Sequence, residues 1–84
     1  KDLVRVYQLI AMEFDENGDY EHSLQFFEKC LEMAHRVNDK DKAAECYQQI
    51  ALIYERQDDM HNAIDYLNKF LEICIESKNN EKLG

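Results

Sequence analysis

Apolar side chains recur along this chain at intervals of three and four residues, which is the period of one face of an α-helix. Four such segments follow one another, with short polar stretches between them. Their apolar positions are Leu3, Tyr7, Ile10 and Phe14, then Tyr20, Leu24, Phe27, Leu31 and Ala34, then Ala43, Tyr47, Ile50 and Tyr54, and finally Met60, Ile64, Leu67, Leu71 and Cys74. The pattern predicts four helices, over about residues 2–16, 20–37, 42–56 and 60–77.

The polar stretches contain residues suited to end one helix and to begin the next. Gly18 follows the first segment, and glycine adopts the left-handed conformation that closes many helices. Asp58 stands in the same place after the third segment, where aspartate adopts that conformation at a higher energetic cost. Asp19 and Asp59 come next and are suited to cap the following helix. We therefore predict turns at 17–19, 38–41 and 57–59, the last weaker than the first.

The first half of the chain returns in the second half, with every match displaced by 40 positions. The pairs are Tyr7 and Tyr47, Gln8 and Gln48, Ile10 and Ile50, Ala11 and Ala51, Asp19 and Asp59, Lys29 and Lys69, Leu31 and Leu71, and Glu32 and Glu72. A constant displacement of this length indicates structural repeats, which bury their apolar faces against one another. We expect one unit at residues 1–40, a second at 41–80, and at 81–84 the start of a further unit in a longer parent array.

These positions resemble the tetratricopeptide repeat, a helix–turn–helix unit with characteristic side chains. Its first helix carries an aromatic residue, a leucine-like residue followed by a small one, and another aromatic residue. Its second helix carries a small residue, a large apolar one and another small one. The chain supplies Tyr7, Ile10, Ala11, Phe14, Ser23, Phe27 and Cys30 in one unit, and Tyr47, Ile50, Ala51, Tyr54, Ala63, Leu67 and Phe70 in the other. The resemblance implies an all-α solenoid of two stacked antiparallel helix hairpins in a right-handed superhelix.

Three departures distinguish the chain from the common pattern of the family. Phe70 replaces a small residue, Asp58 replaces the turn glycine, and the proline that often ends the second helix is absent. His35 and Ile75 stand where that proline is found. Without proline the second helix can continue for more than a turn, which accounts for a period of 40 residues rather than 34. The resemblance is to the longer-repeat branch, found in spindle-orientation adaptors and kinesin light chains.

In such arrays the first helices of successive units line a concave groove that takes a peptide or helix of a partner. Carried over to this chain, the groove comprises Arg5, Gln8, Leu9, Met12, Asp15, Glu16, Glu45, Gln48, Gln49, Leu52, Glu55 and Arg56. Glutamine amides can bond a peptide backbone, and Met12 and Leu52 offer adaptable apolar contact. The rim is net acidic, so we expect a basic or amphipathic protein segment as partner.

Two alternatives to the groove remain open. The chain could be a structural or regulatory segment that packs against another domain of its parent, its predicted groove being merely the solvated side of two helices. It could also self-associate, because two units fall below the three or so that such repeats usually need for independent stability. One partner class is disfavoured: Gln8, Met12 and Gln49 replace the lysine and asparagine with which relatives clamp the acidic C-terminus of heat-shock chaperones.

The net charge of the chain restricts the classes of partner further. A net charge of −8 argues against binding nucleic acid, which needs a basic face, and against docking on an anionic membrane surface. No apolar run approaches the roughly 20 residues that a membrane-spanning helix needs. We expect a cytoplasmic protein, with association to the cytoskeleton as a narrower hypothesis.

Three cysteines leave two interpretations open. Cys30, Cys46 and Cys74 are odd in number and lack the C-x-x-C spacing of common metal and redox motifs. They could form a metal or redox site, or serve as small apolar residues in helix interfaces of a protein in a reducing compartment. The missing spacing favours the second interpretation.

Catalysis and cofactor binding have no candidate residues. Residues 15–19 resemble the opening of a calcium loop, but Tyr20 and Phe26 occupy the positions that need glycine and glutamate. His61 and Asp65 share a helical face, yet zinc normally takes three or four ligands. No nucleophile–base pair or phosphate-binding glycine loop is present in the sequence. We expect a non-catalytic scaffold without cofactor.

Overall fold

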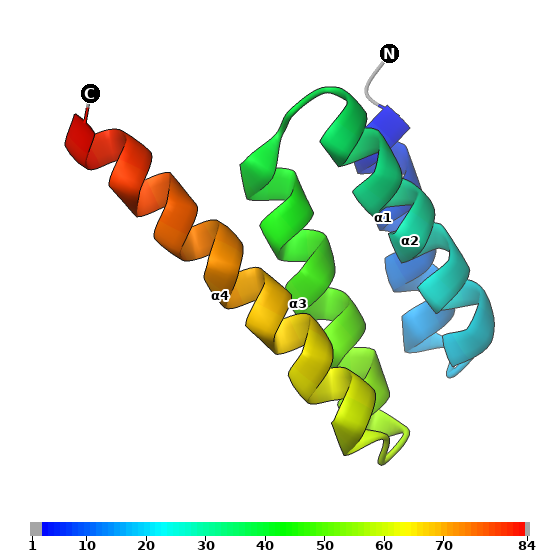
Figure 1. Cartoon of the computed structure of the whole chain (residues 1–84). Coiled ribbons are helices and arrows are strands. Elements are labelled where there is room, and N and C mark those ends of the chain that lie inside the picture. The colour runs from blue at the N-terminus through cyan, green and yellow to red at the C-terminus, as the bar shows by residue number, and fades with distance from the viewer. Residues whose placement is uncertain (1–2, 84) are drawn as a thin grey trace.

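The computed structural model consists of four antiparallel helices that form two stacked hairpins (Figure 1). The helices are α1 (Leu3–Glu16), α2 (Tyr20–Arg36), α3 (Lys40–Arg56) and α4 (Met60–Leu83). The structure describes residues 3–83, with side chains as far as residue 76. Contacts join α1 to α2 and α3 to α4 within the hairpins, and α2 to α3 between them. The predicted all-α helical-repeat fold is confirmed.

All three turns have the same backbone geometry, although their sequences differ. Gly18, Asn38 and Asp58 adopt the left-handed conformation, with φ angles of 83°, 60° and 65°. In each turn the next amide donates to a carbonyl five residues earlier, at 2.8–2.9 Å, which is the Schellman closure of a helix. The turn between the two hairpins therefore has the same geometry as the turns within them. The three turns recur at half the spacing of the sequence repeat.

An aspartate follows each left-handed residue and caps the next helix. Asp19 and Asp39 accept hydrogen bonds from backbone amides three residues later, at 3.4 and 3.2 Å. Because Asp39 acts as the N-cap, α3 begins at Lys40, two residues before its predicted start. The other helix starts within the described residues, at Tyr20 and Met60, agree with the prediction.

The last helix is longer than predicted. α4 continues to Leu83, six residues beyond the expected end at Ser77, so the predicted end of this helix before Asn79 and Asn80 is wrong. Asparagine is only mildly unfavourable inside a helix, and no aspartate follows this pair to cap a new one. Residues 81–83, expected to begin a further unit, continue α4, whereas Lys1, Asp2 and Gly84 lie outside the described residues.

The core extends across both hairpins. Its main cluster joins Ala11 of α1, Phe27 of α2, and Ile50 and Ile53 of α3, all almost completely buried. Close approach of α1 and α2 is fixed by Ser23, whose buried hydroxyl donates to the carbonyl of Ala11 at 2.7 Å. The small residues of the repeat pattern thus lie where helix backbones meet.

A candidate binding face on α1 and α3

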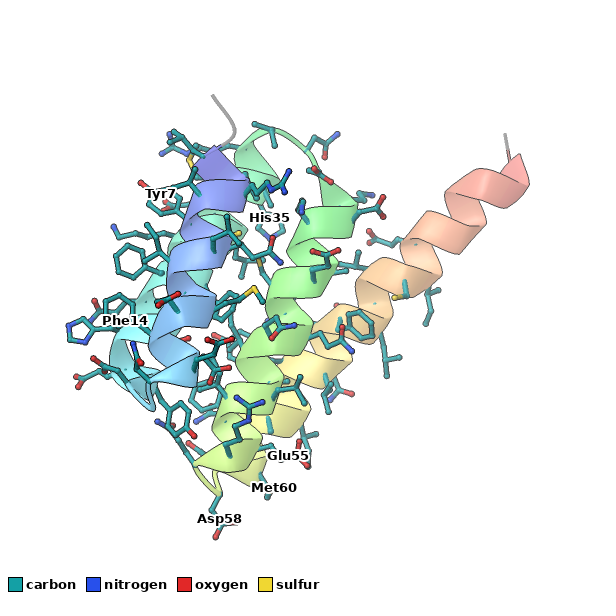
Figure 2. All side chains as sticks on the ribbon, turned by 180° about the vertical axis from the view of Figure 1, so that it is seen from behind. Tyr7, Phe14, His35, Glu55, Asp58 and Met60 are labelled. Atoms are coloured by element: carbon teal, nitrogen blue, oxygen red, sulfur yellow. The ribbon has the colours of Figure 1, made fainter. Side chains whose placement is uncertain are left out.

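The first helices of the two hairpins lie side by side and form one face of the molecule, here called the α1/α3 face (Figure 2). It carries the twelve residues predicted for the groove. Among the described residues, the backbones of α1 and α3 approach each other closely, whereas those of α2 and α4 do not. The two first helices are thus closer together than the two second helices, so this face is on the inner side of the stack.

One ion pair joins α1 and α3 near their C-terminal ends. Nη1 of Arg56 lies 2.7 Å from both carboxylate oxygens of Asp15. The hydrogen bonds and the charge of Asp15 raise the pKa of Arg56. Half of the Arg56 side chain is exposed to solvent, whereas Asp15 is largely covered. This pair links the two helices at one end of the face.

A second polar link joins the helices nearer their other ends. The amide of Gln8 donates to Glu45 at 3.1 Å and accepts from Lys42 at 3.3 Å. Lys42 also lies 3.7 Å from the Glu45 carboxylate. Gln8, predicted to bond a partner's backbone, is therefore already engaged on both sides of its amide. Lys42, which the sequence analysis did not assign to the groove, is therefore part of this polar link.

Three apolar side chains of the predicted set remain open to solvent. Leu9, Met12 and Leu52 are 56%, 42% and 38% exposed. Gln49 is half-buried, whereas Arg5, Glu16 and Glu45 are exposed around them. The face therefore exposes apolar side chains together with charged ones.

Gln48 and Glu55 lie at the outer edge of α3. These two residues are the repeat equivalents of Gln8 and Asp15, whose side chains point from α1 towards α3. Gln48 and Glu55 therefore point from α3 in the same direction, which is away from α1. Figure 2 shows Glu55 on that side of α3. The structure therefore divides the predicted residues into a central group between the helices and an edge pair.

An open depression of about 460 Å³ lies between α1 and α3 near the Arg56–Asp15 pair. It is lined by Met12, Asp15, Glu16, Gln49, Arg56 and Tyr20. Five of these residues belong to the predicted groove, and Tyr20 was missed. The periodicity assigned Tyr20 to the core stripe of α2, and its ring does pack against the main core cluster. The sequence did contain a signal for its place at the depression. Tyr20 directly follows the Asp19 cap, at the N-terminal end of α2, which adjoins the C-terminal end of α1.

The remaining candidate chemistry is not assembled into a site. Among the described residues, no group of three or more histidine, cysteine or acidic side chains could hold a metal ion. Cys30 and Cys46 are buried in the interface between α2 and α3, as predicted. Cys74 is exposed, contrary to the expectation of a helix interface, because no described helix covers that face of α4. No described helix is both long and apolar enough to cross a membrane.

Comparison with known families decides the relationship. A family model of the tetratricopeptide repeat matches residues 2–76. The chain belongs to the tetratricopeptide repeat family. Comparisons with curated proteins and with solved structures gave no match. Tetratricopeptide repeats generally mediate protein–protein interactions and are generally non-catalytic, which agrees with the scaffold class expected from the sequence.

Proposed function

We propose that the α1/α3 face binds a segment of a partner protein. Membership of an interaction-repeat family supports a binding role, and the exposed Leu9, Met12 and Leu52 support its assignment to this face. Methionine and leucine side chains adapt to different partner shapes at little cost. The depression between α1 and α3 is the observation that carries the proposal, because it offers a concave site on the inner side of the stack.

The proposed partner segment is basic and amphipathic. Four of the twelve residues are acidic and two are basic, and the basic Arg56 is already paired with Asp15. A lysine or arginine of the partner can lay its aliphatic stem along Met12 and place its charge near Glu16. The Arg56–Asp15 link holds the walls of the depression before a partner arrives, which reduces the ordering cost of binding.

A peptide-display selection tests this proposal. We expect peptides selected on the chain to combine basic and large apolar residues and to bind more weakly as salt is raised. Replacing Met12→Ala together with Leu52→Ala should raise their Kd at least about tenfold. The matched control is Met60→Ala with Ile64→Ala, which removes one methionine and one branched residue of similar exposure from α4. Selected peptides that respond to the α4 pair, or equally to both, would place binding elsewhere.

A second candidate function is that the chain packs through α4, against another helix of its parent or against a second copy. One observation favours it: an exposed apolar row runs along α4, formed by Met60, Ile64, Leu67, Leu71 and Ile75. Leu67 repeats Phe27, which is completely buried in a cluster that includes Ile50 and Ile53 of α3. A helix placed on α4 as α3 lies on α2 would cover Leu67 in the same way.

A second copy fits that place poorly. If a second copy stacked on α4 as α3 stacks on α2, the α1 helix of that copy would cover α4. Its Glu13 would then occupy the position that the buried Ile53 occupies in α3. Its Glu16 would face Glu55, where the chain itself pairs Arg56 with Asp15. We therefore favour another helix of the parent over self-association. Sedimentation at increasing concentration checks this, and a dimer abolished by Ile64→Lys with Leu71→Lys would establish self-association instead.

A further inference from the structure

Two buried sulfur atoms from different hairpins meet in the interface between α2 and α3. Cys30 and Cys46 are both 0% exposed, and their Sγ atoms lie 3.0 Å apart. The Cys46 thiol donates to the Cys30 sulfur, and the Cys30 thiol donates to the carbonyl of Val4 at 3.2 Å. The two residues are 16 positions apart and lie on either side of the turn at Asn38. Both are free thiols.

The surroundings make the two thiols unequal. The hydrogen bond from Cys46 lowers the pKa of Cys30, and the charge of Lys42 acts in the same direction, while burial and Glu45 oppose them. The same hydrogen bond and burial raise the pKa of Cys46. Cys30 is therefore the sulfur that loses its proton first, and a thiolate rather than a thiol is the nucleophile in cysteine chemistry.

We propose that Cys30 and Cys46 form a modification site at which a peroxide closes an intramolecular disulfide between the two hairpins. The Cys30 thiolate attacks one oxygen of hydrogen peroxide, which forms an S–O bond, breaks the O–O bond and releases hydroxide. Cys46 then gives up its proton and attacks the Cys30 sulfenic acid, forming the S–S bond and releasing the sulfenic oxygen as water. In total, two thiols and one hydrogen peroxide yield one disulfide and two waters.

The geometry requires little movement for this reaction. A disulfide bond is about 2.05 Å long, so the sulfur atoms must approach by about 1 Å from their present separation. Because both atoms are buried, the peroxide enters only when α2 and α3 separate transiently, and we expect the reaction to be slower than oxidation of the exposed Cys74. Reduction by a dithiol reverses it through the same opening.

The disulfide would tie the two hairpins together. α3 carries half of the α1/α3 face, and the bond would join it to α2, which packs directly on α1. The spacing of α1 and α3 would then be held by a covalent link in addition to the Arg56–Asp15 pair. This inference rests on the sulfur geometry and is independent of the proposed function of the face.

The test uses the chain with Cys74→Ser, so that exposed thiols cannot link two molecules. After treatment with hydrogen peroxide, we expect the intact mass to fall by two hydrogen atoms and proteolysis to release a Cys30–Cys46 cross-linked peptide. The thermal midpoint should rise by roughly 10 °C, as for a disulfide that closes a loop of this size in a small domain. Dithiothreitol should reverse both changes.

Matched variants separate the disulfide from other oxidation. Cys30→Ser and Cys46→Ser, each made in the same Cys74→Ser chain, retain one thiol and should show neither the cross-link nor the rise in thermal midpoint. The cross-link is measured on the parent Cys74→Ser chain, so the result does not depend on whether the single variants fold. Oxygen added separately to Cys30 or Cys46 without a cross-link would overturn the proposal. So would two thiols that stay reduced when peroxide treatment is continued long after Cys74 of the native chain is fully oxidised and under mild denaturant that lets α2 and α3 separate.

Discussion

α2 and α4 occupy the same place in their repeats but have different surroundings. Phe27 of α2 is completely buried, because α3 packs on it from the neighbouring hairpin. Its repeat partner Leu67 on α4 is 41% exposed, although the two positions match in the sequence pattern. Contacts inside the hairpins do repeat: Ser23 and its partner Ala63 are both buried. Side chains buried inside a hairpin are therefore buried in both repeats. Side chains at the surface between hairpins are buried only where a neighbouring hairpin is present.

The first helices differ in the same way. Ile53 of α3 is almost completely buried against α2, while its repeat partner Glu13 on α1 is exposed. Cys46 is likewise buried and its partner Val6 exposed. The single interface between hairpins therefore holds most of the large buried side chains. Since the units cannot bury these faces alone, we expect the stability of the chain to depend mainly on this interface.

The sharpest test of this comparison is truncation of the two matched second-helix residues. Phe27→Ala should lower the free energy of unfolding by about 3–5 kcal/mol, because it leaves a cavity in the core. Leu67→Ala removes a side chain already open to solvent and should cost less than about 1 kcal/mol. Urea unfolding followed by circular dichroism measures both. Equal losses would mean that α4 is covered as α2 is, by another chain or by another part of the molecule.

The hydrogen bond inside the first hairpin gives a smaller expected effect. Ser23→Ala removes the hydroxyl that donates to Ala11, which should lower the free energy of unfolding by about 1 kcal/mol. The second hairpin has alanine at the equivalent position, and this Ala63 is also buried. Ala63→Ser should therefore be neutral or slightly stabilising in the same unfolding assay. A large loss in the second variant would show that the two hairpins are not packed alike.

The turns offer a third comparison, in which the substitution is expected to stabilise. Asp58→Gly should raise the free energy of unfolding by about 0.5–1 kcal/mol, because glycine has no Cβ to strain at this φ angle. The reciprocal change Gly18→Asp should lower it by a similar amount. No atom would meet a new Cβ at Gly18 within 4 Å, so its cost comes from the backbone alone. Thermal midpoints that move in the same direction for both changes would refute the equivalence of the turns.

Much of the fold follows from local features that the sequence displays. The ends of α1 and α3, at Glu16 and Arg56, agree with prediction because Gly18 and Asp58 close those helices within a few residues. Asn38 closes α2 by the same geometry. The sequence did not reveal this similarity, because the repeat of 40 residues matches Gly18 with Asp58 and leaves the turn between the hairpins without an equivalent. The end of α4 was missed because asparagine permits either a turn or continued helix.

The α1/α3 face was predictable only as a list of positions. The resemblance to the repeat family assigned the twelve residues to one side of the two first helices, but it did not give the distance between α1 and α3. That distance decides that Gln8 and Asp15 contact α3 while Gln48 and Glu55 lie at the edge. It also brings Tyr20 to the depression, although its spacing marked it for the core. Contacts between helices depend on packing of the whole stack, which a pattern along one chain does not specify.

The smallest expected effect concerns the ion pair that holds α1 and α3 together. Arg56→Gln should change the free energy of unfolding by only a few tenths of a kcal/mol, because its side chain is half exposed and surface pairs contribute little. The matched control is Arg36→Gln, a cation in the same last-turn position of α2. The difference between the variants should vanish in about 1 M salt, where surface charges are screened. A loss above about 1 kcal/mol for Arg56→Gln that persists in salt would mean that the pair fixes the distance between α1 and α3 by itself. The interface between α2 and α3 would then no longer be the main determinant of the stack.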